Sequence, residues 1–195
     1  MNIGILGGSF DPIHMGHIKL AGVAKEQFSL DKILFIPAFI PPHKSSRRDL
    51  TAAPYRYRMV ELAIKNFPGY EISHVELDRP DISYTVDTLS TLKHQSSPRD
   101  IYYLILGADS LEELPQWKNP EAILKMATLL VAPRPGSNKN PYPEHTQWIQ
   151  MPFCLISSSE VRKVFERGEK VPQGFLNPEV ENYIRRMGLY RKDYS

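Results

Sequence analysis

Residues 1–17 constrain the fold more strongly than any other part of this chain. An apolar, strand-like run, Asn2–Leu6, leads directly into the sequence Gly7-Gly8-Ser9-Phe10-Asp11-Pro12-Ile13-His14-Met15-Gly16-His17. Two glycines at the end of a strand let a ligand come close to the backbone, because no Cβ stands in its way. A buried strand that ends in glycines and is followed by a helix is typical of α/β proteins, which bind ligands at the carboxyl ends of their parallel strands.

His14 and His17 lie at the expected start of the helix that follows this strand. Their i, i+3 spacing puts both side chains on one helix face. The ring N–H groups and the free backbone amides of the first turn together suit a polyphosphate. Taken alone, a glycine pair is more often a plain turn, and a single histidine is more often a core or surface residue. Their combination directly after a buried strand favours the phosphate site.

Strand-like and helix-like patterns alternate along the rest of the chain. The predicted strands are Asn2–Leu6, Lys32–Ile36, Glu71–Val75, Ile101–Leu106 and Thr128–Ala132. Several of them are continuously apolar, as in a parallel sheet that is covered on both faces. Residues with helical spacing separate the strands, and the Asn-Pro-Glu sequences at 119–121 and 177–179 are typical helix starts. The prediction is an α/β fold with a Rossmann-like, doubly wound parallel sheet.

Length and composition limit the other possibilities. The 195 residues are enough for one core, so we expect a single domain over residues 1–195 whose part from about residue 155 is helical. A net charge of +2 without a concentrated basic stripe argues against a nucleic-acid partner. The only cysteine, Cys154, excludes an intramolecular disulfide. With no apolar run long enough for a signal peptide or membrane span, we expect a cytoplasmic protein without a membrane partner.

A second informative stretch is Ile156-Ser157-Ser158-Ser159-Glu160-Val161-Arg162. Ser157 and Glu160 have the spacing of a capping box at the start of an amphipathic helix. Taken alone, this stretch is best interpreted as a well-capped helix. Arg162, however, lies in the first turn beside free amides, and an arginine at a helix N-terminus suits a phosphate.

The sequence GGSFDPIHMGH resembles the signature of the nucleotidylyltransferase superfamily, whose hallmark is the element [HT]-x-G-H. The Ile156–Arg162 stretch is similar to the ISSS/T-x-x-R element of the same superfamily. The resemblance implies that His14, His17 and Arg162 act at the phosphates of ATP during attack on its α-phosphorus. The glycine spacing does not match G-x-G-x-x-G, so an oxidoreductase is a distant alternative.

Further elements resemble one branch of that superfamily, the bacterial nicotinate mononucleotide adenylyltransferases. They are the segments Pro41–Lys44, Ser83–Thr88, Gly107–Ser110 and Leu114–Lys118, and with the first two elements they cover nearly the whole chain in order. The ATP-binding residues that the resemblance implies are Gly7, Gly8, Ser9, Phe10, His14, His17, Gly107, Asp109, Ser157, Ser158 and Arg162. Those implied for the nicotinate nucleotide are Lys44, Thr85 and Trp117. Each suits its role, since Trp117 offers an aromatic plane for a pyridine ring and Lys44 a charge for a phosphate, although Trp117 is also a candidate core residue.

The reaction that the resemblance implies is transfer of AMP from ATP to nicotinate mononucleotide, with release of pyrophosphate, in NAD biosynthesis. The attacking phosphate oxygen is already anionic, so no general base is needed, and catalysis consists of positioning and charge neutralisation. No clustered carboxylates are expected to hold a metal, and Mg²⁺ would arrive with ATP. The alternatives are a phosphopantetheine adenylyltransferase-like enzyme and a non-catalytic nucleotide-binding regulator. The oligomeric state stays open, with a homodimer as one option.

Other basic residues receive no firm assignment. Arg47 and Arg48 share a loop with Lys44 and are expected to face solvent. Arg56 and Arg58 lie in the first turn of a predicted helix, where a phosphate contact is the weaker interpretation.

Overall fold

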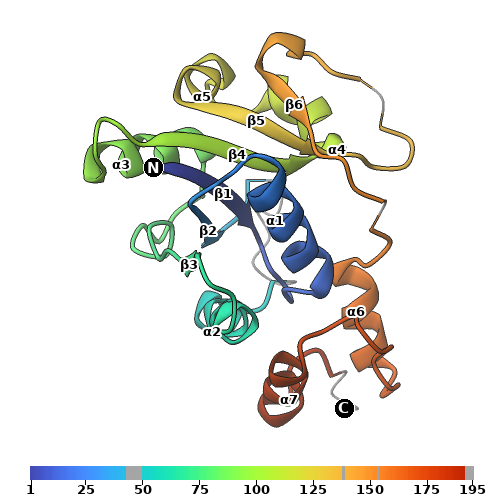
Figure 1. Ribbon diagram of the computed structural model, residues 1–195. Coiled ribbons are helices and arrows are strands. Elements are labelled where there is room, and N and C mark those ends of the chain that lie inside the picture. The colour runs from blue at the N-terminus through green and yellow to red at the C-terminus, as the bar shows by residue number, and fades with distance from the viewer. Residues whose placement is uncertain (43–49, 138, 153, 192–195) are drawn as a thin grey trace.

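The predicted α/β fold is confirmed by the computed structural model, which describes residues 1–42, 50–137, 139–152 and 154–191. These residues form a six-stranded, wholly parallel sheet in the order β3-β2-β1-β4-β5-β6 (Figure 1). The strands are β1 (Asn2–Gly8), β2 (Lys32–Pro37), β3 (Tyr70–Ile72), β4 (Ile101–Gly107), β5 (Ala127–Ala132) and β6 (Thr146–Trp148). The order reverses between β1 and β4, which opens a crevice at their carboxyl ends where doubly wound proteins bind ligands.

Two strand predictions need correction. The predicted strand Glu71–Val75 is only Tyr70–Ile72, because backbone bonds to the carbonyl of His74 turn the chain there, and Val75 is buried in a loop instead. The edge strand β6 was not predicted, since Thr146-Gln147-Trp148 has no apolar run. The other four strands are confirmed with bounds that differ by one or two residues.

Helices cover both faces of the sheet (Figure 1). One face is covered by α1 (Met15–Gln27) and α2 (Ala53–Ile64), and beyond them lie α6 (Ser158–Glu166) and α7 (Pro178–Met187). The other face is covered by α3 (Thr85–Gln95), α4 (Ala108–Glu113) and α5 (Pro120–Met126). Short 3₁₀ turns follow α4 at Leu114–Gln116 and precede β6 at Pro143–His145. None of the helices in these ranges has the length and apolarity that crossing a bilayer requires.

The predicted helix starts are confirmed by their caps, and a glycine ends the last helix. The side chains of Asn119 and Asn177 accept hydrogen bonds from first-turn amides of α5 and α7. Gly188 ends α7 with a φ of 64°, in the left-handed region that glycine adopts without strain. Ser157 and Glu160 form the predicted capping box of α6.

Two apolar clusters separate the layers. Ile33, Phe35 and Leu130 of the sheet pack with α1, α2, α6 and α7, while Ile36, Leu129 and Val131 pack with α3, α4 and α5. Successive side chains of each strand point to opposite faces of the sheet, so each strand contributes to both clusters. Neither face of the sheet is therefore exposed to solvent. The C-terminal helices thus share a buried core with α1, whose N-terminus lies at the crevice.

Candidate active site

A pocket open to solvent lies at the carboxyl ends of the central strands. Its lining includes His14, His17, Gly107, Arg134, Cys154 and Ile156. Three segments that are far apart in the sequence therefore meet there: the start of α1, the start of α4 and the chain that leads into α6. This is the edge of the sheet at which the strand order reverses.

The two histidines stack on one another at the start of α1. Their ring centroids are 3.7 Å apart, and the backbone N–H of His14 donates to Nδ1 of His17 over 3.2 Å. Because Nδ1 of His17 accepts this bond, its neutral ring carries the proton on Nε2 and can donate from there. Nδ1 of His14 is buried and has no hydrogen-bond partner among the described residues. A buried polar atom without a partner is uncommon, and here it lies beside the pocket.

Both rings are uncharged near neutral pH. Burial lowers the pKa of His14 to about 4, assisted by the positive charge of Arg134 and opposed by Glu160. Burial also holds the pKa of His17 well below its ordinary value, and the neighbouring His14 and Arg134 act in the same direction. The pair thus offers neutral N–H donors rather than fixed charges, and an incoming polyanion would make their protonation easier.

The β1–α1 loop, Ser9–His14, directs one predicted ligand residue away from the pocket. Phe10 has a φ of 46° and an exposure of 1%, and its ring packs edge-on against His17 with centroids 5.1 Å apart. Its side chain supports His17 from the core, so only its backbone can face a ligand. Gly7 is exposed at the end of β1, and Gly8 and Ser9 are half-buried beside it.

Helix α6 is fastened to this loop by two side chains. The Ser158 hydroxyl donates to the carbonyl of Pro12 over 2.9 Å, and Nη1 of Arg162 donates to the carbonyl of Asp11 over 2.6 Å. The hydroxyl of Ser157 takes part in the capping box with Glu160. Arg162 therefore lies at the β1–α1 loop, and part of its guanidinium is used to hold that loop.

On the opposite side of the pocket, Arg134 is a site residue that the sequence analysis missed. Its Nε lies 3.9 Å from Oδ1 of Asp109, and Nη1 donates to the carbonyl of Cys154 over 3.5 Å. Asp109 is exposed in the first turn of α4, after Gly107. Arg134 belongs to no motif, and its only signal in the sequence is its position two residues after a buried strand.

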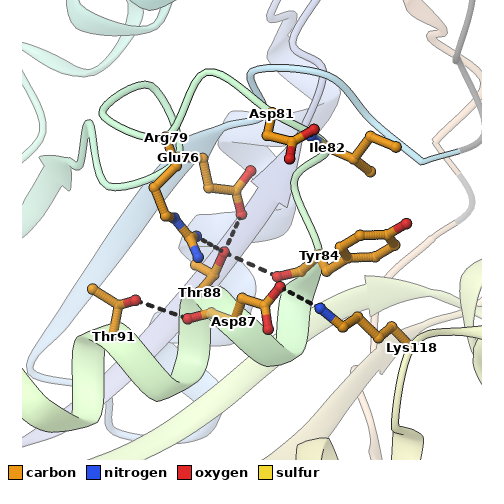
Figure 2. Close-up of polar contacts among 9 residues, drawn as sticks. All are labelled: Glu76, Arg79, Asp81, Ile82, Tyr84, Asp87, Thr88, Thr91 and Lys118. Atoms are coloured by element: carbon orange, nitrogen blue, oxygen red, sulfur yellow. Dashed lines mark hydrogen bonds and ion pairs between the residues drawn. The ribbon is translucent and has the colours of Figure 1, made fainter.

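Of the residues predicted for a second nucleotide, Thr85 and Trp117 lie outside this pocket's lining. Thr85 is the first residue of α3, and Trp117 is half-buried against the apolar cluster that also contacts Tyr84. Lys118 lies over the ring of Tyr84, 4.6 Å from its centroid, and pairs with Asp87 at 2.9 Å (Figure 2). Trp117 therefore packs against the core, as the alternative interpretation expected. It also lies near the start of α3. Lys44 lies outside the described residues.

The weak assignment of Arg56 to a phosphate is wrong. Arg56 has no exposed surface, and its guanidinium donates to three backbone carbonyls, those of Ser9, Phe39 and Thr51. Every side of this cation that could bind a phosphate is occupied by protein. Arg58 is exposed and pairs with Glu61 on the surface of α2.

No metal site is formed by protein side chains alone within the described ranges. Among those residues, no three His, Cys, Asp or Glu side chains are arranged to hold an ion. A cation at this pocket would therefore take its ligands mainly from phosphate oxygens and water, which is how Mg²⁺ commonly binds in nucleotide sites.

Comparison with known proteins gives consistent results. Residues 5–164 match the family described as cytidylyltransferase-like. A protein of Thermoanaerobacter sp. strain X514, named probable nicotinate-nucleotide adenylyltransferase, is 38% identical over 99% of this chain and 96% of its own length. A protein of Thermus thermophilus with the same name is 40% identical over 98% of this chain and 100% of its own. The structure of Plasmodium falciparum nicotinic acid mononucleotide adenylyltransferase complexed with NaAD superposes with a TM-score of 0.79 at 24% identity, covering 97% of each chain.

Proposed function

The chain belongs to the cytidylyltransferase-like family, and from that membership we propose that it transfers AMP from ATP to nicotinate mononucleotide, forming nicotinic acid adenine dinucleotide and pyrophosphate. Relatives that cover nearly its whole length carry the name of this activity. The observation that supports the chemistry most directly is the stacked, neutral pair His14 and His17 at a helix start, with an orphaned ring nitrogen at the pocket.

On the donor side, ATP would lie with its phosphates at the start of α1. Nε2–H of His17, the ring of His14 and the backbone N–H of Gly16 would donate to phosphate oxygens, because the amides of Met15 and His17 already bond to the carbonyls of Phe175 and His14. Arg162 and Arg134 would add positive charge from two opposite directions. The glycines Gly7 and Gly107 would leave room for the nucleotide, and Asp109 would accept from a ribose hydroxyl.

The reaction is an in-line displacement. A phosphate oxygen of nicotinate mononucleotide attacks the α-phosphorus, the bond from that phosphorus to the bridging oxygen of the β-phosphate breaks, and pyrophosphate leaves with the electron pair. The attacking oxygen is anionic, so the residues need to hold and neutralise rather than move a proton. Magnesium bound to the ATP phosphates supplies further neutralisation of the leaving group.

On the acceptor side, Lys44, Thr85 and Trp117 are the residues we propose for nicotinate mononucleotide. Trp117 would stack on the pyridine ring, which does not by itself distinguish an acid from an amide. The free amides at the start of α3 would donate to the carboxylate. A carboxamide would turn its NH₂ toward these donors and leave a buried group unpaired, which costs about 1–3 kcal/mol for each group.

One assay tests the proposal and its rivals. Pyrophosphate release is measured with ATP and each of nicotinate mononucleotide, nicotinamide mononucleotide and 4′-phosphopantetheine. We expect the nicotinate compound to be preferred over the nicotinamide compound by roughly tenfold to several-thousandfold in kcat/KM. Preference for phosphopantetheine would identify the alternative enzyme, and ATP binding without turnover on any acceptor would identify a regulator.

A further inference from the structure

Two buried side chains of opposite charge, Arg56 and Glu76, are used by neither substrate site. Arg56 has an exposure of 0% and Glu76 of 7%. Burying a charged side chain costs free energy unless hydrogen bonds compensate it. Their contacts, however, lie between the two halves of the proposed active site.

Arg56 connects the β1–α1 loop to the chain that leaves β2. Its Nη1 donates to the carbonyl of Ser9 over 2.8 Å, and its Nη2 donates to the carbonyl of Phe39 over 3.0 Å. The guanidinium is rigid and planar, so it fixes the distance between the two carbonyls that it bonds.

Phe39 is in turn bonded to the segment that begins α3. Its backbone N–H donates to the Ser83 hydroxyl over 2.9 Å, and the N–H of Ser83 donates to the carbonyl of Ile40 over 2.9 Å. A parallel bridge between Ile40 and Ile82 holds the same two stretches together. The chain after β2 and the start of α3 are therefore bonded to one another at several points.

Glu76 bonds to the start of α3 from its buried side. Its carboxylate accepts from the Ser83 hydroxyl and, over 2.6 Å, from the hydroxyl of Thr88 in α3. The Thr88 oxygen also accepts from Nη2 of Arg79 over 3.0 Å (Figure 2). Burial raises the pKa of Glu76, while these hydroxyls and the charges of Arg79 and Arg56 oppose that rise.

A continuous path of buried and half-buried polar contacts thus runs from Ser9 through Arg56, Phe39, Ser83 and Glu76 to Thr88. We propose that Arg56 and Glu76 are positioning residues, which set the separation between the β1–α1 loop and the start of α3. This inference rests on the proposed function, in which ATP binds at the first of these and the acceptor nucleotide at the second. In-line attack needs the reacting atoms about 3–3.5 Å apart, and a misplacement of about 1 Å can cost about 100-fold in rate.

Thr88 offers the cleanest test, because it touches neither substrate in the proposed arrangement. Thr88→Val keeps the shape of the side chain and removes its bonds to Glu76 and Arg79, whereas Thr88→Ser keeps the hydroxyl. We expect Thr88→Val to raise the KM of nicotinate mononucleotide about tenfold and to lower kcat, with the KM of ATP within about twofold of wild type. Thr88→Ser should restore both values.

A general loss of folding cannot produce this split between the two KM values. Equal changes in both, or no change in either, would overturn the positioning role. Hydrogen exchange at the Phe39 amide gives a readout that does not depend on the reaction, and it should accelerate in Thr88→Val but not in Thr88→Ser. If the wild-type protein uses no pyridine nucleotide, the proposed function fails, and unchanged exchange at Phe39 would then reject the positioning path on its own.

Discussion

The donor and acceptor sides of the crevice are held in place by different means. On the donor side, the β1–α1 loop and α6 bond directly to one another through Ser158 and Arg162. On the acceptor side, the start of α3 is held through side chains buried beneath it, Ser83, Glu76 and Thr88. The first arrangement bonds α6 directly to the loop that precedes His14, whereas the second holds the start of α3 through side chains packed behind it. Substitutions on the donor side should therefore lower kcat, and substitutions on the acceptor side should raise the KM of the acceptor nucleotide.

The largest effect is expected from His17→Ala on the donor side. Removing one preorganised donor to the transferring phosphate typically costs on the order of 100- to 1000-fold in kcat, about 3–4 kcal/mol. Steady-state rates and a thermal unfolding curve measure activity and folding separately. His94→Ala, at an exposed position in α3, is the control and should keep wild-type rates. Activity within a few-fold of wild type would remove His17 from the reaction.

Next in size is the dependence of stability on pH that His14 imposes. Its pKa falls from 6.5 in the unfolded chain to about 4 in the folded protein, so the unfolded state binds more protons between these values. Stability is then full above about pH 6.5 and declines as the pH falls toward 4, by about 3 kcal/mol in total. His17 acts in the same direction.

Urea unfolding between pH 7 and 4.5 measures this dependence, with His14→Asn as the matched variant. The variant should show a flatter profile over that range. Parallel profiles for the two proteins would mean that His14 is not the group being protonated.

A smaller effect, about tenfold in kcat/KM for ATP or 1.4 kcal/mol, is expected from Arg162→Ala. The guanidinium supplies charge at the β1–α1 loop and bonds the Asp11 carbonyl, while the cap of α6 depends on Ser157 and Glu160 instead. Arg167→Ala, at an exposed position just after α6, is the comparison. If ATP use is unchanged in both variants, Arg162 belongs to the surface and the donor side needs another cation.

The smallest effect is expected from Arg58→Ala. This exposed arginine pairs with Glu61 on α2, and surface pairs of this kind contribute about 0.5 kcal/mol or less. Arg58 lies two residues from the buried Arg56. The variant therefore shows whether helix α2 tolerates the loss of an exposed arginine. A change in either KM would contradict the separation between surface and buried positions on this helix.

The sequence predicted the donor side better than the acceptor side for a physical reason. Strand β1, the glycines and His14 to His17 are adjacent in the chain, so short-range rules of strand ends and helix starts suffice. Arg56 could not be placed, because its acceptors Ser9, Phe39 and Thr51 come from separate segments and only folding brings them together. In the sequence alone it has the pattern of an ordinary charged residue near a helix start.

Arg134 and β6 were missed for related reasons. Arg134 gains its significance from Asp109 and Cys154, which contact it in the fold but are far from it in the sequence. Strand β6 is an edge strand without an apolar pattern, and only its pairing with Leu129–Val131 of β5 defines it. Both features depend on contacts between distant segments, which local patterns do not report.

Tyr190 determines when the β1–α1 loop can be fully anchored during synthesis of the chain. Its hydroxyl donates to Oδ1 of Asp11 over 2.6 Å across a sequence separation of 179 residues. At a synthesis rate of about 5–20 residues per second, the ribosome makes Tyr190 about 10–35 seconds after Asp11. Nascent chains halted before that residue therefore contain both histidines and the whole parallel sheet, but lack the contact that completes the anchoring of Asp11. The anchoring of Asp11 is therefore complete only after residue 190 has been synthesised.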